Sequence, residues 1–151
     1  MFNASVTTIV IFGIPECLLL ILAIYTFGRK EVNKKDYILS SLFYLLIIIF
    51  TRSMPVLFGV HIIINIAFLI LISVKLIKLP VNKAISCGLI IFALRAFTEL
   101  INILMLIKIF NVDMEKTFNN DIIKNLYGLP SLLMYGCIIL LANRIIKRQK
   151  Y

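Results

Sequence analysis

The sequence has no tryptophan, one histidine and three cysteines, and only seven of its 151 residues are acidic. A catalytic Cys–His pair is disfavoured, because no cysteine is expected level with the single histidine, His61, along the predicted helices. The zinc motif HExxH, the nucleophile motif GxSxG and the phosphate-binding P-loop are all absent. The sequence therefore predicts a protein that is not an enzyme and that has no metal site and no cofactor.

The cysteines and glycines also lack recognisable spacings. Cys17, Cys87 and Cys137 all lie inside apolar runs, and none belongs to a CxxC or another metal-type motif. We expect them to be small, buried hydrophobic residues. No GxxxG motif occurs, so a tight glycine-mediated dimer seam is not indicated.

Apolar residues, in contrast, are abundant. They make up 62% of the chain, and the mean hydropathy is +1.04, whereas soluble domains carry roughly 45–50% apolar residues. The excess is spread along the whole chain, which leaves no room for a soluble domain of useful size. The composition therefore predicts an all-α, polytopic bundle of transmembrane helices that forms one domain over residues 1–151.

Five apolar runs define the predicted spans, and a membrane span needs roughly 17–25 residues. The runs are Val6–Phe27, Tyr37–Thr51, Val56–Val74, Ala84–Ile107 and Leu129–Ile146. The second run gives only about 22 Å of helix at ~1.5 Å per residue. Either it continues through Arg52, which then reaches outward, or it is a tilted or partial helix.

The basic residues between the runs predict the orientation. One side would carry eleven of them: Arg29, Lys30, Lys34, Lys35, Lys75, Lys78, Lys83, Arg144, Lys147, Arg148 and Lys150. The other side would carry four: Arg52, Lys108, Lys116 and Lys124. Since cytoplasmic loops are enriched in Lys and Arg, we expect five spans with the N-terminus outside and the C-terminus in the cytoplasm.

The polar stretch Lys108–Tyr127 has an apolar stripe that is typical of an interfacial helix over residues 113–127. The stripe consists of Met114, Phe118, Ile122 and Leu126. Asp113 would cap this helix, Gly128 would end it, and Pro130 would lie in the first turn of the last span. The alternative is a solvated loop.

Three ionisable residues lie inside the apolar runs, where charge is costly and often functional. Glu16 lies eleven residues from Phe27, and Arg95 lies eleven residues from Ala84. Both should therefore be roughly 16 Å deep at ~1.5 Å per residue, which predicts an ion pair between two spans. Glu99 lies one turn further out. These residues could form a structural salt bridge or line a polar cavity for a ligand, ion or proton.

A second polar set lies nearer the predicted outer surface: Arg52, His61, Asn65 and Asn102. His61 and Asn65 are four residues apart and share a helix face, and Asn102 faces nearly the same way as Glu99. We expect these groups to continue a polar track and to line a pocket that opens outward. Pro15 should kink the first span just before Glu16.

The net charge of +9 is better explained by membrane topology and by anionic lipid at the cytoplasmic face than by nucleic acid. The N-terminal run has no preceding basic residues, so we expect a retained helix rather than a cleaved signal. The abundance of Ile, Lys and Asn is typical of an AT-rich bacterial genome. The predicted location is therefore the bacterial plasma membrane.

Three segments resemble the membrane-embedded N-terminal sensor region of certain Firmicutes histidine kinases, the clostridial and bacillar kinases related to peptide receptors of the accessory gene regulator type. The segments are Ile14–Glu16, Arg52–His61 and Gly128–Leu132, in matching order and spacing. The resemblance implies a signal that passes inward through the C-terminal helix. It does not imply kinase activity, because the sequence contains no residues of an ATP-binding domain.

Three functions remain as hypotheses. The first is a membrane sensor or receptor module that binds a small ligand or peptide and signals through its last helix to a cytoplasmic kinase or other signalling protein, with a homodimer left open. The second is a small transporter, or its substrate-binding subunit, that uses Glu16 and Glu99 for coupling to ions or protons. The third is a structural scaffold of a membrane complex.

Overall fold

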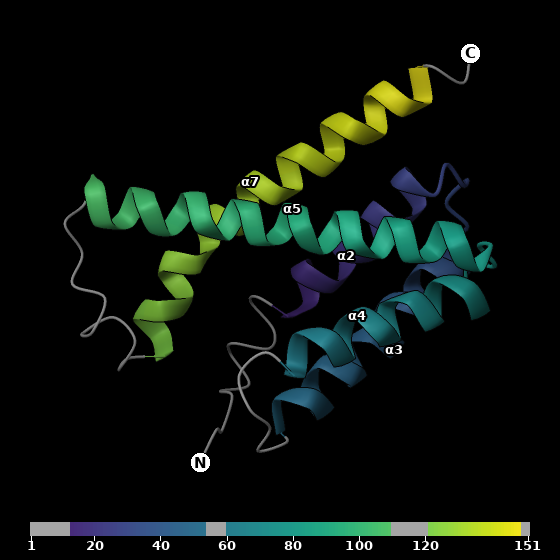
Figure 1. Cartoon of the computed structure of the whole chain (residues 1–151), viewed down its shortest axis with the longest axis horizontal. Coiled ribbons are helices and arrows are strands. Elements are labelled where there is room, and N and C mark those ends of the chain that lie inside the picture. The colour runs from purple at the N-terminus through teal and green to yellow at the C-terminus, as the bar shows by residue number, and fades with distance from the viewer. Residues whose placement is uncertain (1–12, 54–59, 110–120, 149–151) are drawn as a thin grey trace.

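The computed structural model describes residues 13–53, 60–109 and 121–148, and this part of the chain contains helices and turns but no strand. The helices in these ranges are α2 (Ile14–Phe27), α3 (Lys34–Ser53), α4 (Val60–Lys75), α5 (Val81–Lys108) and α7 (Asp121–Arg148) (Figure 1). The prediction of an all-α fold is confirmed for the described residues.

The helices α2 and α5 form the centre of the bundle. α2 packs against α3, α5 and α7, and α4 packs against α3 and α5. α5 and the Tyr127–Arg148 part of α7 are long and apolar enough to cross a membrane, and α2 and α4 are apolar but shorter in the described residues. Because α2 and α5 each pack against three other helices, Glu16 on α2 and Arg95 on α5 lie where helices meet.

α3 is longer than the apolar run that predicts it. The side chain of Asn33 caps its start, because Asn33 Oδ1 accepts a hydrogen bond from the Lys35 backbone N–H at 3.2 Å. At its other end the helix continues through Arg52 to Ser53, giving 20 residues, or about 30 Å. The helix thus continues through Arg52, and whether it crosses a membrane upright or tilted stays a prediction.

Apart from the start of α7, the remaining boundaries agree with the predicted runs to within three residues where both are described. α5 begins three residues before Ala84, directly after Pro80, and ends one residue after the predicted run. Pro15 lies in the first turn of α2, two residues after Gly13, whose backbone is already helical. The predicted kink before Glu16 concerns residues 6–12, which lie outside the described residues, as do 56–59 and 113–120.

The prediction that Gly128 ends one helix and Pro130 begins the next is wrong. α7 runs without interruption from Asp121 through both residues, and Pro130 lies inside it. Proline removes one hydrogen bond from the helix, so nearby carbonyl groups need other donors. The Asn102 side-chain amide donates to the Tyr127 carbonyl, and the Ser131 hydroxyl donates to the Gly128 carbonyl. α7 changes direction where it passes α5 (Figure 1).

The buried core consists of large apolar and tyrosine side chains from all five described helices, such as Ile21, Tyr44, Leu69, Ile91 and Ile139. Many equally large apolar side chains point outward instead. The cysteine prediction holds for two positions only: Cys17 and Cys87 are buried, whereas Cys137 lies exposed on α7. An apolar environment around the bundle would suit an exposed cysteine as well as an interior would.

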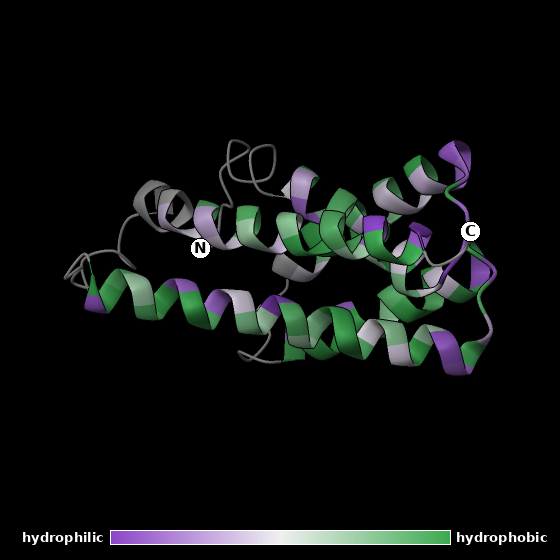
Figure 2. Cartoon of the chain, turned by 90° about the horizontal axis from the view of Figure 1, so that it is seen from above, coloured by the Kyte–Doolittle hydropathy of each residue, from purple (hydrophilic) through white to green (hydrophobic). Residues whose placement is uncertain are grey.

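The basic loops that join α2 to α3 and α4 to α5 lie against each other. The Lys30 ammonium group donates hydrogen bonds to the carbonyls of Ile77 and Lys78, which lie in the other loop. The C-terminal end of α7 lies at the same end of the bundle in both views (Figure 1, Figure 2). We call this region, comprising residues 28–33, residues 76–80 and the last turn of α7, the basic end. Hydrophilic segments gather there (Figure 2).

Candidate functional site

The side chains on the inward face of α5 change from small or apolar to polar, and back to apolar, along the helix. Its buried positions recur every three or four residues, as expected for one face of a helix. Near the basic end they are small or apolar, and in the middle Arg95, Thr98 and Asn102 occupy the same stripe before it becomes apolar again at Leu106. Polar side chains are therefore placed where α5 meets α2 and α7.

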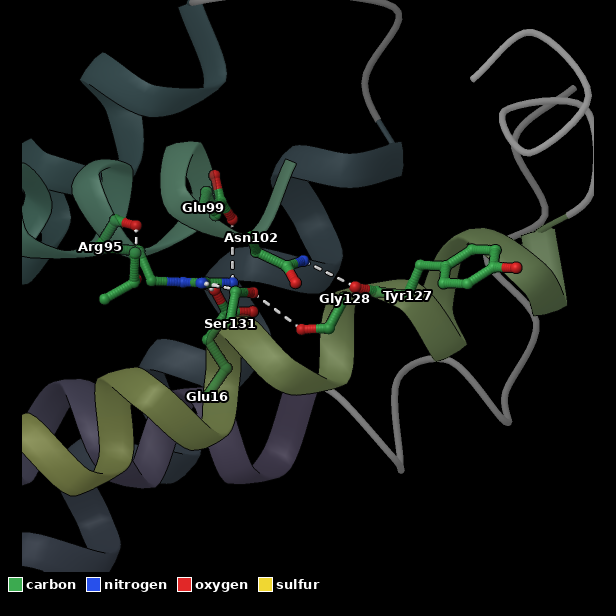
Figure 3. A network of polar contacts seen from close by, with 8 residues as sticks. Glu16, Arg95, Glu99, Asn102, Tyr127, Gly128 and Ser131 are labelled. Atoms are coloured by element: carbon green, nitrogen blue, oxygen red, sulfur yellow. Dashed lines mark hydrogen bonds and ion pairs between the residues drawn. The ribbon is translucent and has the colours of Figure 1, made fainter. Parts of the chain in front are cut away.

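Arg95 joins three helices through its guanidinium group (Figure 3). Its Nε lies 3.2 Å from Glu16 Oε1 on α2, and its Nη2 lies 2.9 Å from Glu99 Oε1 on α5. Its Nη1 donates to Ser131 Oγ on α7 at 3.3 Å. We call Glu16, Arg95, Glu99 and Ser131 the arginine node. The planar guanidinium suits this role because its donors point in several fixed directions.

Further hydrogen bonds connect the arginine node to the backbone. The Ser131 hydroxyl accepts from Arg95 and donates to the Gly128 carbonyl at 2.8 Å. Two turns beyond Arg95, Asn102 Nδ2 donates to the Tyr127 carbonyl at 2.7 Å. Both acceptors lie just before Pro130, where the helix lacks a donor. The polar face of α5 therefore supports the bent part of α7.

The two carboxylates differ in their surroundings. The side chains of Arg95 and Glu16 are 15% and 18% exposed, whereas that of Glu99 is 54% exposed. One guanidinium faces two carboxylates, so the three groups carry one formal negative charge in excess. Glu16 lies between helices, and Glu99 lies at the edge of the contact. Of the two carboxylates, Glu99 is therefore the better placed to carry the excess negative charge, because it lies on the exposed side of α5.

Two buried tyrosines lie beside the arginine node. Tyr135 is one turn after Ser131 on the same face of α7, and its hydroxyl has no hydrogen-bond partner among the described residues. The charges of Glu16 and Arg95 both act electrostatically on this hydroxyl. Tyr44 on α3 is also within electrostatic range of Glu16. Glu16 therefore has phenol groups of two further helices within electrostatic range.

The structure brings the predicted site residues into two groups. The ion pair between Glu16 and Arg95, predicted from their equal depth, is confirmed, and Glu99 joins it. Asn65 on α4 instead contacts Thr51 on α3, with 3.3 Å between Oδ1 and Oγ1. His61 is half-buried, and its Nδ1 has no partner in the described ranges. Arg52 lies in α3, but its side chain is outside the described residues. A single pocket that includes both groups stays a prediction.

Sequence reasoning missed Ser131 and Tyr135 as members of the site. Both lie on the buried face of α7 and are spaced four residues apart. Ser131 directly follows Pro130, and a serine beside an interior proline is a useful signal, because its hydroxyl can bond a carbonyl of the preceding turn, as Ser131 bonds Gly128. That signal requires knowing that the helix continues through the proline.

We expect Asn102→Ala to lower the free energy of unfolding by about 0.6–1.7 kcal/mol, which are the average and the maximum measured for polar contacts between membrane helices. The variant loses the donor to the Tyr127 carbonyl near the bend of α7. Unfolding by sodium dodecyl sulfate, followed by circular dichroism, would measure the change. Ser86→Ala is the matched control on the same helix, because the exposed Ser86 hydroxyl bonds only its own helix at Asn82. Equal costs for the two variants would contradict the assigned contact.

The arginine node connects α2, α5 and α7 through an ion pair and a hydrogen bond of Arg95. Within the described ranges, no group of three or more His, Cys, Asp or Glu side chains could hold a metal ion. No family model, no curated protein and no solved structure matches this chain. Its function therefore has to be argued from its own geometry, and the resemblance to sensor regions of histidine kinases stays a prediction.

Proposed function

We propose that the chain is a five-span membrane bundle with its N-terminus outside and its C-terminus in the cytoplasm. Large apolar side chains cover the outer faces of all five described helices. In water such a surface would favour aggregation, whereas lipid tails solvate it at no cost. The proposal is also supported by α5 and by the Tyr127–Arg148 part of α7, which are both long enough to cross a bilayer.

The basic end supports the proposed orientation. Lys30 ties the first basic loop to the second, and the C-terminal end of α7 carries Lys147 and Arg148 at the same end of the bundle. Basic residues concentrated at one end of a membrane bundle face the cytoplasm, where anionic lipid headgroups attract them. The second run then spans as α3, about 30 Å long at ~1.5 Å per residue.

Within this bundle we propose a non-enzymatic sensor or receptor module whose switch is the arginine node. The observation that carries the proposal is the hydrogen bond from Arg95 to Ser131, because it links the Glu16–Arg95 pair to the bent part of the last helix. A ligand or a membrane change that weakens the pair would remove a support of α7. The cytoplasmic end of α7 would then move and alter its contact with a signalling partner.

The input would come from the outer side. Arg52 and His61 would stand at the mouth of an outward-facing site for a small ligand or peptide, and the polar face of α5 would lead inward to the arginine node. Coupling requires that the ligand interact differently with two arrangements of the same element. A bent helix held by side-chain donors is such an element, because a change in those donors changes its bend.

Distance measurements between spin labels would test this proposal. The labels would sit at Ser86 on α5 and Ile145 on α7, both exposed, in a variant without native cysteines in lipid nanodiscs. We expect Glu16→Gln to change their separation by about 2 Å or more, the scale of helix shifts in switching proteins. Glu31→Gln, which removes the same charge outside the arginine node, should leave it unchanged.

An unchanged distance in folded Glu16→Gln protein would contradict the switch. Flux assays in proteoliposomes separate the sensor from the transporter hypothesis. A sensor should carry no ion or substrate flux, whereas a transporter should show flux that Glu16→Gln abolishes. Flux of that kind would overturn the proposed function even if α7 moves.

A further inference from the structure

The Glu99 carboxylate stands within an otherwise apolar outer face of α5. Its neighbours Phe97 and Leu100 are 57% and 55% exposed, and Ile103, one turn further on the same side, is 41% exposed. Glu99 itself is 54% exposed. If α5 spans the membrane, as proposed above, Glu99 lies only about 7 Å from the middle of the helix at ~1.5 Å per residue. A charge that faces lipid at that depth is costly, and such charges are often functional.

Arg95 does not remove this cost. Its guanidinium is shared between Glu16 and Ser131 as well as Glu99, so one positive charge serves two carboxylates. Glu16 is enclosed by helices, and Glu99 is exposed to three times the extent of Glu16. The carboxylate that faces outward from the bundle is therefore one that shares its cation with Glu16. A second positive group that approaches this face of α5 would be attracted to it strongly in a low-dielectric environment.

We propose that Glu99 is the contact point for a transmembrane helix of another protein, one that carries a lysine or arginine at the same depth. The apolar neighbours of Glu99 favour a helix over a small soluble cation, because they offer the kind of surface that packs against a helix. The inference rests on the membrane arrangement proposed above. It does not depend on the sensor mechanism.

A second copy of the chain is a poor partner for this contact. In the described parts of the five apolar runs, Arg95 and Arg144 are the only lysine or arginine residues. Arg95 is engaged in the arginine node, and Arg144 lies one turn from the basic end of α7. A second copy therefore offers no available cation at the depth of Glu99. A different chain is required to supply one.

Synthetic transmembrane peptides of leucine and alanine provide the probe. One peptide would carry a lysine one turn from its centre, a second would carry leucine there, and a third would carry its lysine at the end. Energy transfer between labelled full-length protein and labelled peptide, in vesicles of neutral and anionic lipid, would report binding. We expect the first peptide to bind at least about tenfold more tightly than the other two. Glu99→Gln should abolish this preference, and Glu31→Gln should preserve it.

Equal binding of the three peptides would overturn the proposal, as would a lysine preference that survives in Glu99→Gln. Energy transfer between two copies of the protein that Glu99→Gln abolishes would also overturn it, because the partner would then be a second copy. Extraction of the protein from vesicles by alkaline carbonate would contradict the membrane arrangement itself. Failure of the proposed function and failure of this inference are thus distinguishable.

Discussion

Arg95→Leu is expected to lower the free energy of unfolding by about 3–5 kcal/mol, the cost of breaking a buried ion pair by removing one partner. The variant removes the Arg95 cation from the Glu16 carboxylate between helices, and it removes a donor from Ser131. The contacts of α5 with α2 and α7 should weaken together. Unfolding in mixed micelles by sodium dodecyl sulfate, followed by circular dichroism, would measure the loss.

The losses in free energy of unfolding of the matched variants should follow an order that depends on the observed contacts of Arg95. Glu16→Leu should cost less than Arg95→Leu, because Arg95 then keeps Glu99 as a single, balanced partner at 2.9 Å. Arg95→Lys should fall between wild type and Arg95→Leu, since a point charge cannot reach three acceptors in fixed directions. Similar losses for Glu16→Leu and Arg95→Leu would show that Arg95 does not hold two carboxylates.

The second prediction with a large expected effect concerns which side of the membrane each end of α5 faces. In a variant without native cysteines, Lys35→Cys, in the first turn of α3 beside the basic end, should react with a membrane-impermeant maleimide only after the cells are permeabilised. Lys108→Cys, at the opposite end of α5, should react in intact cells. We expect more than about a tenfold difference in labelling between the two positions, because the basic end should face the cytoplasm.

Labelling of both positions in intact cells would contradict the five-span arrangement, because the two ends of α5 would then lie on the same side of the membrane. Labelling of Lys35→Cys alone would contradict the orientation while leaving the number of spans intact. A labelled Ile145→Cys variant, at the C-terminal end of α7, should behave as Lys35→Cys does. This third position tests whether α7 returns to the basic end in the membrane.

The sequence allowed the central contact to be predicted because depth along a helix follows from residue number alone. Glu16 and Arg95 are each eleven residues from the same side of the bundle, and opposite charges at equal depth attract strongly in an apolar environment. Each helix in the described residues overlaps one of the apolar runs for the same reason. These features depend on local sequence and on a rise of ~1.5 Å per residue.

The course of α7 could not be predicted in this way. Gly128 and Pro130 are local signals for a break, and they are sound signals when no distant group intervenes. Here Asn102, on another helix, supplies a donor to the Tyr127 carbonyl, so the helix bends instead of ending. The partner of Asn65 was equally out of reach, because Thr51 became its neighbour only through the packing of α3 on α4.

A double-mutant cycle on Glu16 and Arg95 would test most directly whether one ion pair ties α2 to α5. The free energies of unfolding of Glu16→Leu, Arg95→Leu and the double variant would be compared with wild type in the same micelles. We predict a coupling energy of about 1.5–3 kcal/mol, with the double variant more stable than Arg95→Leu alone. A coupling energy below about 0.3 kcal/mol, the limit for independent sites, would contradict the pairing.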